Sequence, residues 1–433
     1  KPRDVNVVEI IRQRDLDIRV ICPTEDMTSL PYEIMSSKMY DLLYEMVLEH
    51  RTTIVFTNTR SATENVVFKL KERGLEGVEA HHGSLSKETR LDVEERLKQG
   101  ELKCVASSTS LELGIDIGSV DLVVQIGSPK SVAKGLQRIG RAGHGHGLTS
   151  KGRILVFEKD DLVECAVLCR AARKKRIDRV SISENALDVL SQSLVGMSLE
   201  KRWDVQEALR VVRSSYCYRN LEEESFLEVL RYLGSKDAFE GVYPKLWYDE
   251  EEQRFGRRGS SRMIYFLNLG TIPEEANYRV FTDKGGMIGD LSEKFVERLS
   301  TRDVFVLGGR SYEYVRTKGM KVFVREATGR KPTVPSWSGE MLPRSFDLSM
   351  GVATFRGELK KRLEKGEDEK IILDWLGSFG IDQGSARSIL SYFQEQRASC
   401  GFIPHDRELA IEGYIDMSGN YNLVFHFPFG RRV

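Results

Sequence analysis

The first 178 residues alternate short apolar runs with amphipathic stretches, and this alternation limits the possible folds more than any other feature. Runs typical of buried strands lie at residues 5–10, 18–22, 53–56, 103–106, 122–126 and 154–157. Stretches with apolar residues at helical spacing lie at 39–49, 61–73 and 87–99, with Ser61 and Ser86 as expected N-caps. Strands that alternate with helices form a parallel sheet covered on both faces. Residues 1–178 are therefore predicted to be a doubly wound α/β lobe.

Residues 179–258 are predicted to form a mainly helical domain. Helical patterns at 185–196, 204–213 and 221–233 precede an expected hairpin at 243–248 and 253–258. This order is typical of a winged helix, in which one helix packs toward a duplex and the hairpin forms the wing. An ordinary helical connector is the alternative interpretation of the same pattern.

Residues 259–433 are predicted to combine a β-rich segment with helices. Strand-like runs lie at 263–269, 278–282, 303–307, 312–315 and 321–325, separated by Gly-rich turns. They favour a small antiparallel barrel or sandwich. Helices follow, the clearest from Asp382 to about Ser399, and then strand-like runs at 409–415 and 422–427. The predicted order is thus a doubly wound lobe with a parallel sheet, a winged helix, and a β-rich, barrel-like domain with helices.

Composition limits the compartment and the partners. The chain has 65 basic and 65 acidic residues and no formal net charge, so any phosphate-binding surface must be a local patch. Candidate patches are 170–179 and 254–262, and a solvated surface is the alternative for both. The six cysteines form no Cys-x-x-Cys pair, which favours a reducing compartment over a disulfide framework or a zinc ribbon.

No metal site and no membrane partner are expected. His81 and His82 have no Cys or carboxylate at ligand spacing, so the sequence predicts no metal there. No apolar run approaches the length that spans a bilayer, and the chain starts without an apolar leader. We therefore expect a soluble, cytoplasmic protein.

The segment Leu-Gln-Arg-Ile-Gly-Arg-Ala-Gly-His at 136–144 follows a predicted strand and gives the strongest chemical signal. Arg138 and Arg141 are three residues apart, so on a helix they would share one face and direct two guanidinium groups at one polyphosphate. Gly140 and Gly143 leave room for a close approach. The segment therefore predicts a polyphosphate contact.

Three further segments end strands with hydroxyl-bearing or cationic residues. In 107–117, hydroxyls and backbone N–H groups could hold a sugar-phosphate chain while Asp116 faces a nucleotide ribose, and a capped turn is the alternative. Segments 56–60 and 81–84 end strands in a similar way. In a parallel sheet these loops and segment 136–144 would share one edge, where open α/β folds bind ligands.

Together these segments resemble helicase motifs IV to VI of superfamily 2. The matching residues are Thr-Asn-Thr-Arg at 57–60, His-His-Gly-Ser-Leu at 81–85, Ser-Thr-Ser-Leu-Glu-Leu-Gly-Ile-Asp-Ile-Gly at 108–118 and Gln-Arg-Ile-Gly-Arg-Ala-Gly-His at 137–144. More narrowly, 111–118 with Gly-Ser-Pro-Lys-Ser-Val at 127–132 is similar to the large-helicase-related (Lhr) family. Segments 308–310, 332–340 and 343–345 also look like the accessory region of that family, so the resemblance covers nearly the whole chain.

The resemblance implies that residues 1–178 are a second RecA-like helicase lobe. It also implies roles for individual residues. Arg141 is similar to the arginine finger that reaches the γ-phosphate of ATP across the cleft between two motor lobes, with Arg138 beside it; such a finger can be worth ~10³ to 10⁵ in rate. The residues that match positions near the nucleotide are Gly114, Asp116, Gln137 and His144, where His144 replaces the commoner Arg. Those that match nucleic-acid contacts are Thr57, Arg60, His82, Ser108 and Thr109.

Trp337 is a further candidate for a nucleic-acid contact. It follows Pro335 and precedes Gly339-Glu340. An aromatic ring on a stiff, proline-flanked loop is well placed to stack on an unpaired base. A buried core tryptophan is the alternative.

The sequence lacks the parts that hold the phosphates of ATP. A complete motor needs a Walker A loop and an acidic box for Mg²⁺, and this chain contains no Gly-Lys dipeptide. Its acidic runs at 249–252 and 368–370 lie in polar surroundings rather than after a buried strand. The family places its first motor lobe N-terminal to the second. ATP and Mg²⁺ are therefore expected to be held mainly by a first RecA-like lobe in cis, outside this chain.

The resemblance implies the C-terminal part of an ATP-driven, 3′-to-5′ DNA helicase that acts on single-stranded DNA and on forked or hybrid duplexes. This chain alone is not expected to hydrolyse ATP. One alternative is a non-catalytic nucleic-acid-binding or strand-annealing module. The other is a helicase that tracks on RNA, as related Ski2-like helicases do.

Overall fold

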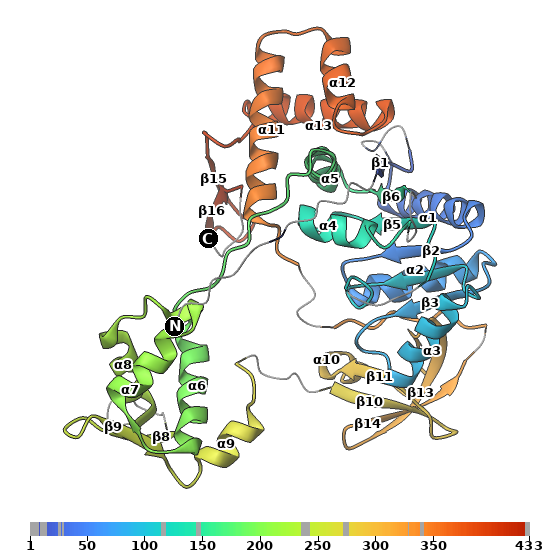
Figure 1. Cartoon of the computed structure of the whole chain (residues 1–433). Coiled ribbons are helices and arrows are strands. Elements are labelled where there is room, and N and C mark those ends of the chain that lie inside the picture. Colours follow the sequence, from blue (N-terminus) through green and yellow to red (C-terminus); the bar gives the residue numbers. More distant parts are fainter. Residues whose placement is uncertain are drawn as a thin grey trace. The chain divides into compact units, whose positions relative to one another are not determined.

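A computed structural model describes residues 8, 15–24, 27, 30–113, 118–143, 149–234, 243–271, 277–327, 329–337 and 342–428. The chain divides into two compact units, one made of residues 1–178 and 276–433 and the other of residues 179–275. Figure 1 shows the elements of both units along the chain. The strand predicted at 5–10 lies outside the described residues, apart from Val8.

A six-stranded parallel sheet forms the centre of the first unit. Its strand order is β1-β6-β5-β2-β4-β3, and every neighbouring pair is parallel. The strands are β1 Leu16–Ile21, β2 Thr53–Phe56, β3 Val78–His81, β4 Cys104–Ser107, β5 Leu122–Ile126 and β6 Ser150–Leu155. Because all six strands run in one direction, their carboxyl ends lie at a single edge of the sheet. The predicted RecA-like, doubly wound lobe is confirmed.

Helices cover both faces of this sheet. They are α1 Tyr32–Glu49, α2 Arg60–Glu72, α3 Lys87–Lys98, α4 Val132–Ile139 and α5 Lys159–Arg173. Successive strand residues face opposite ways: Ile54 and Phe56 belong to the core that includes α3, α4 and α5, whereas Val55 belongs to the core that includes α2 and most of α1. Strand residues that are apolar at every position are thus explained by burial on both faces.

One of the two predicted helix caps is confirmed, and the other is wrong. Ser86 caps α3 as expected, because its hydroxyl accepts from the Thr89 N–H at 3.1 Å. The cap of α2 is Thr59, whose hydroxyl accepts from the Ala62 N–H at 3.0 Å, and not the predicted Ser61. Ser61 instead donates its hydroxyl to the Pro335 carbonyl at 2.7 Å.

A five-stranded, barrel-like sheet extends the core of the α1 and α2 face. Its strand order is β11-β10-β14-β13-β12, and the elements are β10 Asn277–Thr282, β11 Met287–Ser292, α10 Glu293–Val296, β12 Val304–Leu307, β13 Arg310–Lys318 and β14 Lys321–Glu326. The sheet is mixed and not purely antiparallel as expected, because β10 and β14 run parallel. Val280, Leu291 and Phe305 share one buried cluster with Val66 and Leu70 of α2.

A buried carboxylate joins this sheet to the lobe. Glu64 on α2 accepts hydrogen bonds from the N–H groups of Gly308 at 2.6 Å and Gly309 at 2.8 Å. Both glycines have positive φ, 63° and 68°, as the tight turn between β12 and β13 requires. A Cβ on Gly309 would also lie 2.4 Å from a methyl group of Val67. The segment 308–310 is therefore a glycine turn shaped to fit α2.

We predict that Glu64→Ala destabilises the protein by about 3 kcal/mol. The substitution leaves two buried N–H groups without an acceptor, and each such loss costs on the order of 1–3 kcal/mol. Denaturant unfolding measures the change. Glu72→Ala on the same helix is the control, because Glu72 is half exposed and pairs with Lys69, an ion pair worth about 0.5 kcal/mol. Equal losses in the two variants would contradict the assignment.

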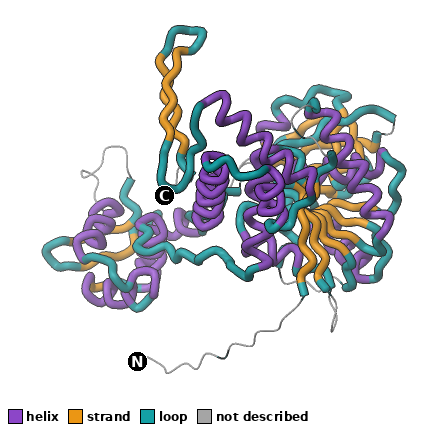
Figure 2. The backbone as a smooth tube through the Cα atoms, turned by 90° about the horizontal axis from the view of Figure 1, so that it is seen from above, coloured by secondary structure: helices purple, strands orange, loops and turns teal. Residues whose placement is uncertain are grey.

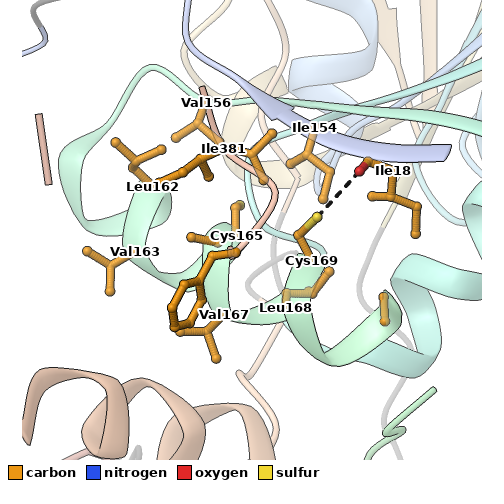
Figure 3. Close-up of a cluster of buried hydrophobic side chains, with 14 of the residues drawn as sticks. Ile18, Ile154, Val156, Leu162, Val163, Cys165, Val167, Leu168, Cys169 and Ile381 are labelled. Carbon is orange, nitrogen blue, oxygen red and sulfur yellow. Dashed lines mark hydrogen bonds between the residues drawn. The ribbon is translucent and has the colours of Figure 1, made fainter. Parts of the chain in front are cut away.

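Three helices extend the core of the other face. They are α11 Phe346–Glu364, α12 Glu369–Gly377 and α13 Gln383–Cys400, and α13 matches the helix predicted at 382–399. Figure 3 shows the cluster in which Ile381 packs with Ile154 and Val156 of the lobe, and in which the Cys169 thiol donates to the Ile18 carbonyl at 3.6 Å. The strands β15 Ala410–Ile415 and β16 Tyr421–His426 form an antiparallel hairpin that projects from these helices, as Figure 2 shows.

The second unit has the predicted winged-helix architecture. Its elements are α6 Leu187–Glu200, β7 Trp203–Asp204, α7 Val205–Arg213, a 3₁₀ helix at Tyr216–Tyr218, α8 Glu223–Gly234, β8 Leu246–Asp249, β9 Arg254–Arg257 and α9 Ser261–Leu267. The three strands form a sheet in the order β7-β9-β8. Leu194, Leu209, Phe226 and Phe255 are buried in one core between the helices and this sheet.

One predicted strand in this region is wrong. Residues 263–269 were expected to be a strand, but most of them lie in α9. The Tyr265 ring packs so closely on α6 that a Cβ on Gly196 would come within 2.9 Å of it. A short apolar run does not by itself separate a helix from a strand, and packing on α6 decides here. Residues 259–271 accordingly lie in the second unit and not with the β-rich sheet.

Candidate functional site

Four loops at the carboxyl edge of the parallel sheet are hydrogen-bonded to one another. The Asn58 amide after β2 donates to the Ser128 carbonyl after β5 at 2.7 Å. The Arg60 guanidinium donates to the Ser84 hydroxyl after β3 at 2.6 Å, and the Ser110 hydroxyl after β4 donates to the His81 carbonyl at 2.9 Å. The sequence segments singled out above therefore form one connected polar edge.

Arg138 is the centre of this network and is fully buried. Its Nε donates to Glu112 Oε2 at 3.0 Å, and one of its terminal nitrogens donates to Gln125 Oε1 at 2.8 Å and to Asn58 Oδ1 at 3.3 Å. The guanidinium also lies 5.4 Å from the centre of the Phe56 ring. Burial lowers the pKa of Arg138, and the Glu112 carboxylate opposes that shift. Arg138 thus connects α4 to three strand ends.

This placement corrects the prediction that Arg138 and Arg141 point together at one polyphosphate. The spacing argument assumed a helix that includes both residues, but α4 ends at Ile139 and Gly140 is its C-cap. The two side chains consequently leave the shared helical face: Arg138 is buried in the lobe, and Arg141 is only half-buried. Arg138 supports the loop that carries Arg141, and its own side chain is fully buried against protein partners.

The loop around Arg141 is fixed on its C-terminal side as well. Ala142 is buried, and its carbonyl accepts from the Ser150 hydroxyl at 2.9 Å. The Gly143 N–H donates to the Val120 carbonyl at 3.0 Å, and its φ of 72° favours glycine. Gln137 is exposed on α4. The candidates Gly114, Asp116 and His144 lie outside the described residues.

The N-terminus of α4 is held by Asp178, a residue that the sequence did not single out. Its carboxylate accepts from the Ala133 N–H at 2.9 Å, from the Ser131 hydroxyl at 2.8 Å and from the Ser345 hydroxyl. Burial raises the pKa of Asp178, but these hydrogen bonds outweigh it and keep the pKa below its usual value. The helix before Arg141 is therefore anchored at both ends.

Two segments that resemble the Lhr family meet beside this helix. Arg344 donates to the buried Glu164 at 3.0 Å, and Lys130 pairs with Asp161 at 2.8 Å. The Ser345 N–H donates to the Lys130 carbonyl at 2.8 Å. Segments 127–132 and 343–345 thus form one polar cluster, although they are more than two hundred residues apart.

Three predicted nucleic-acid residues also meet in space. The ring centre of Trp337 lies 5.5 Å from that of His82, and the Arg60 guanidinium lies 6.0 Å from the Trp337 ring. Trp337 is 8% exposed, and its indole N–H donates to the Asp290 carbonyl at 3.2 Å. His82 is fully buried and lies 2.8 Å from Glu64. Trp337 and His82 are therefore largely buried where the lobe packs on the barrel-like sheet.

The remaining candidates differ in how accessible they are. Thr57 is buried, and its hydroxyl donates to the Thr59 carbonyl at 2.9 Å. Ser108 is buried, whereas Thr109 is exposed and Arg60 is half-buried. Arg60, Thr109, Gln137 and Arg141 are thus the candidates whose side chains reach the surface of this edge.

The predicted basic patch at 170–179 is partly turned inward. The Arg170 guanidinium lies 4.3 Å from the Phe379 ring centre, and Arg173 donates to the Ile18 carbonyl at 2.7 Å.

Within the described residues, no helix is long and apolar enough to cross a bilayer. No group of three or more His, Cys, Asp or Glu side chains among those residues is arranged to hold a metal ion.

We predict that substitution of the two arginines lowers the free energy of unfolding by very different amounts. Arg138→Ala leaves Glu112 buried without its partner, so the free energy of unfolding should fall by about 3–5 kcal/mol. Arg141→Ala, at a half-buried position, should change it by about 1 kcal/mol or less. Urea denaturation of both variants measures the difference. Comparable losses would show that Arg138 does not carry the packing role given to it here.

Two protein-family models match parts of this chain. Residues 37–146 match the family model described as the helicase conserved C-terminal domain. Residues 170–334 match the model of the winged helix domain of the large helicase-related protein. The lobe, with its polar edge, therefore corresponds to the helicase conserved C-terminal domain. The chain belongs to the Lhr-Core helicase family.

Known helicases are similar to this chain over nearly its whole length. It is 48% identical to ATP-dependent helicase Lhr-Core protein 2 of Thermococcus barophilus and 46% identical to ATP-dependent helicase Lhr-Core of Methanothermobacter thermautotrophicus, with all of this chain aligned in both cases. It covers 50% and 51% of those proteins. The structure of Mycobacterium smegmatis helicase Lhr bound to ssDNA and AMP-PNP matches 97% of this chain and 51% of its own, with a TM-score of 0.72 and 29% identity. The chain thus spans about half the length of these relatives.

Proposed function

We propose that this chain is the C-terminal part of an ATP-dependent 3′-to-5′ DNA helicase or translocase of the Lhr type, with Arg141 as its arginine finger. The observation that carries the proposal is the loop around Arg141, which the buried Arg138 fixes at the sheet edge where the predicted motifs meet. The sequence contains no Walker A loop, so ATP and Mg²⁺ would be held mainly by a first motor lobe in cis.

The geometry of the loop suits a finger role. A guanidinium group stabilises the charge that develops on the phosphoryl oxygens during transfer, and it does so best when it needs no rearrangement. Arg138, Ala142 and Gly143 hold the backbone on both sides of Arg141, so little conformational entropy remains to be lost there. Arg138 is then a positioning residue, and Gly114, Asp116, Gln137 and His144 remain proposed neighbours of the nucleotide.

The same edge supports a track for single-stranded DNA. Arg60 and Thr109 reach its surface, whereas Thr57, Ser108 and His82 would support them from below. A base could stack on Trp337 after Arg60 leaves its ring. We propose residues 1–178 as the motor lobe, residues 179–275, with α9 included, as the winged-helix part, and residues 276–433 as the accessory part that grips the strand. The boundary expected at residues 258 and 259 thus moves to residues 275 and 276. Forked and hybrid duplexes are the proposed substrates of the whole protein.

The test is Arg141→Ala in the parent protein that contains both motor lobes. We expect nucleic-acid-stimulated ATP hydrolysis to fall by about 10³-fold or more, with little change in the affinity for single-stranded DNA. Arg141→Lys should recover only part of the rate, because lysine lacks the planar fork. Lys151→Ala, an exposed cation on β6, is the matched control and should hydrolyse ATP normally. Undiminished hydrolysis by Arg141→Ala would exclude the finger role.

A second candidate function is non-catalytic strand binding or annealing, which the missing Walker A loop favours for this chain alone. Annealing of complementary strands by the 433-residue chain, without ATP, tests it directly. Tracking on RNA is the remaining alternative. Competition between DNA and RNA strands of one sequence at a fixed salt concentration decides between them, because phosphate contacts are similar and only the 2′-hydroxyl differs.

A further inference from the structure

The outer face of the barrel-like sheet carries three cations side by side on neighbouring strands. Lys321 of β14 lies opposite Arg279 of β10 on one side and opposite Lys318 of β13 on the other. All three side chains are exposed, and none forms an ion pair within the described part of the chain. Like charges directly opposite each other destabilise a sheet. Asp290 of β11 lies opposite Arg279 and offsets that cation, but Lys321 is paired only with the cations Arg279 and Lys318. The pairing of Lys321 with Lys318 is therefore unfavourable unless an anion lies across it.

A pair of aromatic rings lies next to these cations on the same face of the sheet. Phe281 of β10 is opposite Phe323 of β14, with ring centres 6.2 Å apart and planes inclined by 31°. The Arg316 guanidinium lies 5.2 Å from the Phe323 ring centre, and the Lys321 ammonium lies 5.4 Å from that of Phe281. Both rings are half-buried although they face outward. We name these six residues the barrel face: Arg279, Phe281, Arg316, Lys318, Lys321 and Phe323.

The barrel face is distinct from the part of the sheet that contacts the lobe. The side chains that alternate with it on β10 and β14, Val280, Val322 and Val324, form the core. The lobe contacts the sheet through β11, where the Asp290 N–H donates to the Ser84 carbonyl at 2.8 Å, and through the Gly308–Gly309 turn. Packing between the lobe and this sheet therefore does not explain the cations and rings of the barrel face.

We propose that the barrel face binds single-stranded nucleic acid, as a second contact surface away from the motor edge. Phosphates would neutralise the row of cations, and unpaired bases would stack on the two rings, a combination typical of single-strand binding surfaces. The face is local to an otherwise neutral chain, so it would direct a strand to one place on the surface. The strand is taken to be that of the proposed motor, and binding here requires no ATP.

The first experiment measures the salt dependence of strand binding by the full 433-residue chain. Lys318→Gln/Lys321→Gln should weaken the binding of a fluorescent oligo-dT. The negative slope of the logarithm of the association constant against the logarithm of the salt concentration should become shallower by about 1.4, since each phosphate contact on a single strand contributes about 0.7. An oligo-rU of equal length should show the same change, because the face has contacts for phosphates and bases only. An unchanged slope with both strands would overturn the proposal.

Two controls separate binding from folding and from overall charge. Lys361→Gln/Lys365→Gln, at the exposed end of α11, removes the same charge and should leave the slope unchanged. The Lys318/Lys321 variant should unfold at the same or a higher denaturant concentration, because it removes a like-charge repulsion. A slope lowered equally in both double variants would mean that only net charge matters, and would overturn the site.

The second experiment locates the strand and tests stacking. Photo-cross-linking with an oligonucleotide that carries 5-iodouracil should label peptides containing Phe281 and Phe323. Phe281→Leu/Phe323→Leu should weaken single-strand binding about 5- to 100-fold and leave binding of a duplex of the same sequence unchanged. Equal loss on duplex and single strand would overturn the stacking assignment. Cross-links confined to the motor edge would overturn the barrel face but not the proposed function, which Arg141→Ala tests independently.

Discussion

A parallel sheet with apolar residues on both faces must be covered on both sides, and this requirement organises the whole first unit. The core on the α1 and α2 side continues into the barrel-like sheet through Val280, Leu291 and Phe305. The core on the α5 side continues into α11, α12 and α13. Elements that come more than a hundred residues later thus complete the two cores of the lobe. The accessory sheet and helices therefore belong to the same compact unit as the lobe.

Buried charges make these contacts specific. Glu64 accepts from the backbone of the Gly308–Gly309 turn, and Arg138 bridges Glu112, Gln125 and Asn58. A buried ion is costly unless all its hydrogen bonds are made, so each of these groups tolerates only one arrangement of its partners. Hydrophobic packing alone would allow the elements to slide. The buried charges therefore set the geometry at the two places where it matters most, the lobe-to-sheet contact and the loop of Arg141.

The sequence predicted what depends on local pattern and missed what depends on contacts between distant segments. Apolar runs identified β2 and β4 because every residue of these strands is buried. β3 at Val78–His81, which has a half-buried Glu79, was not among the predicted runs. The spacing of Arg138 and Arg141 suggested one shared face, but the helix ends between them at Gly140. The partners of Arg138 lie 26, 13 and 80 residues away, and no sequence pattern marks Glu112, Gln125 or Asn58 as a set. Asp178 was missed for the same reason.

The positions of charged residues in the sequence likewise reveal some charged surfaces and miss others that form only when distant strands pair. The runs at 170–179 and 254–262 are visible in the sequence, yet Arg170 and Arg173 of the first run are used in packing. Three cations of the barrel face, Arg316, Lys318 and Lys321, lie within six residues of sequence, and Arg279 and the Phe281 ring join them only when β10 pairs with β14. In a sheet, alternate residues of each strand face the same side, and side chains directly opposite each other on adjacent strands lie about 5 Å apart. A sheet can therefore combine a short basic segment with side chains from a distant strand into one surface, and in a chain with no net charge such surfaces are where phosphate contacts have to be sought.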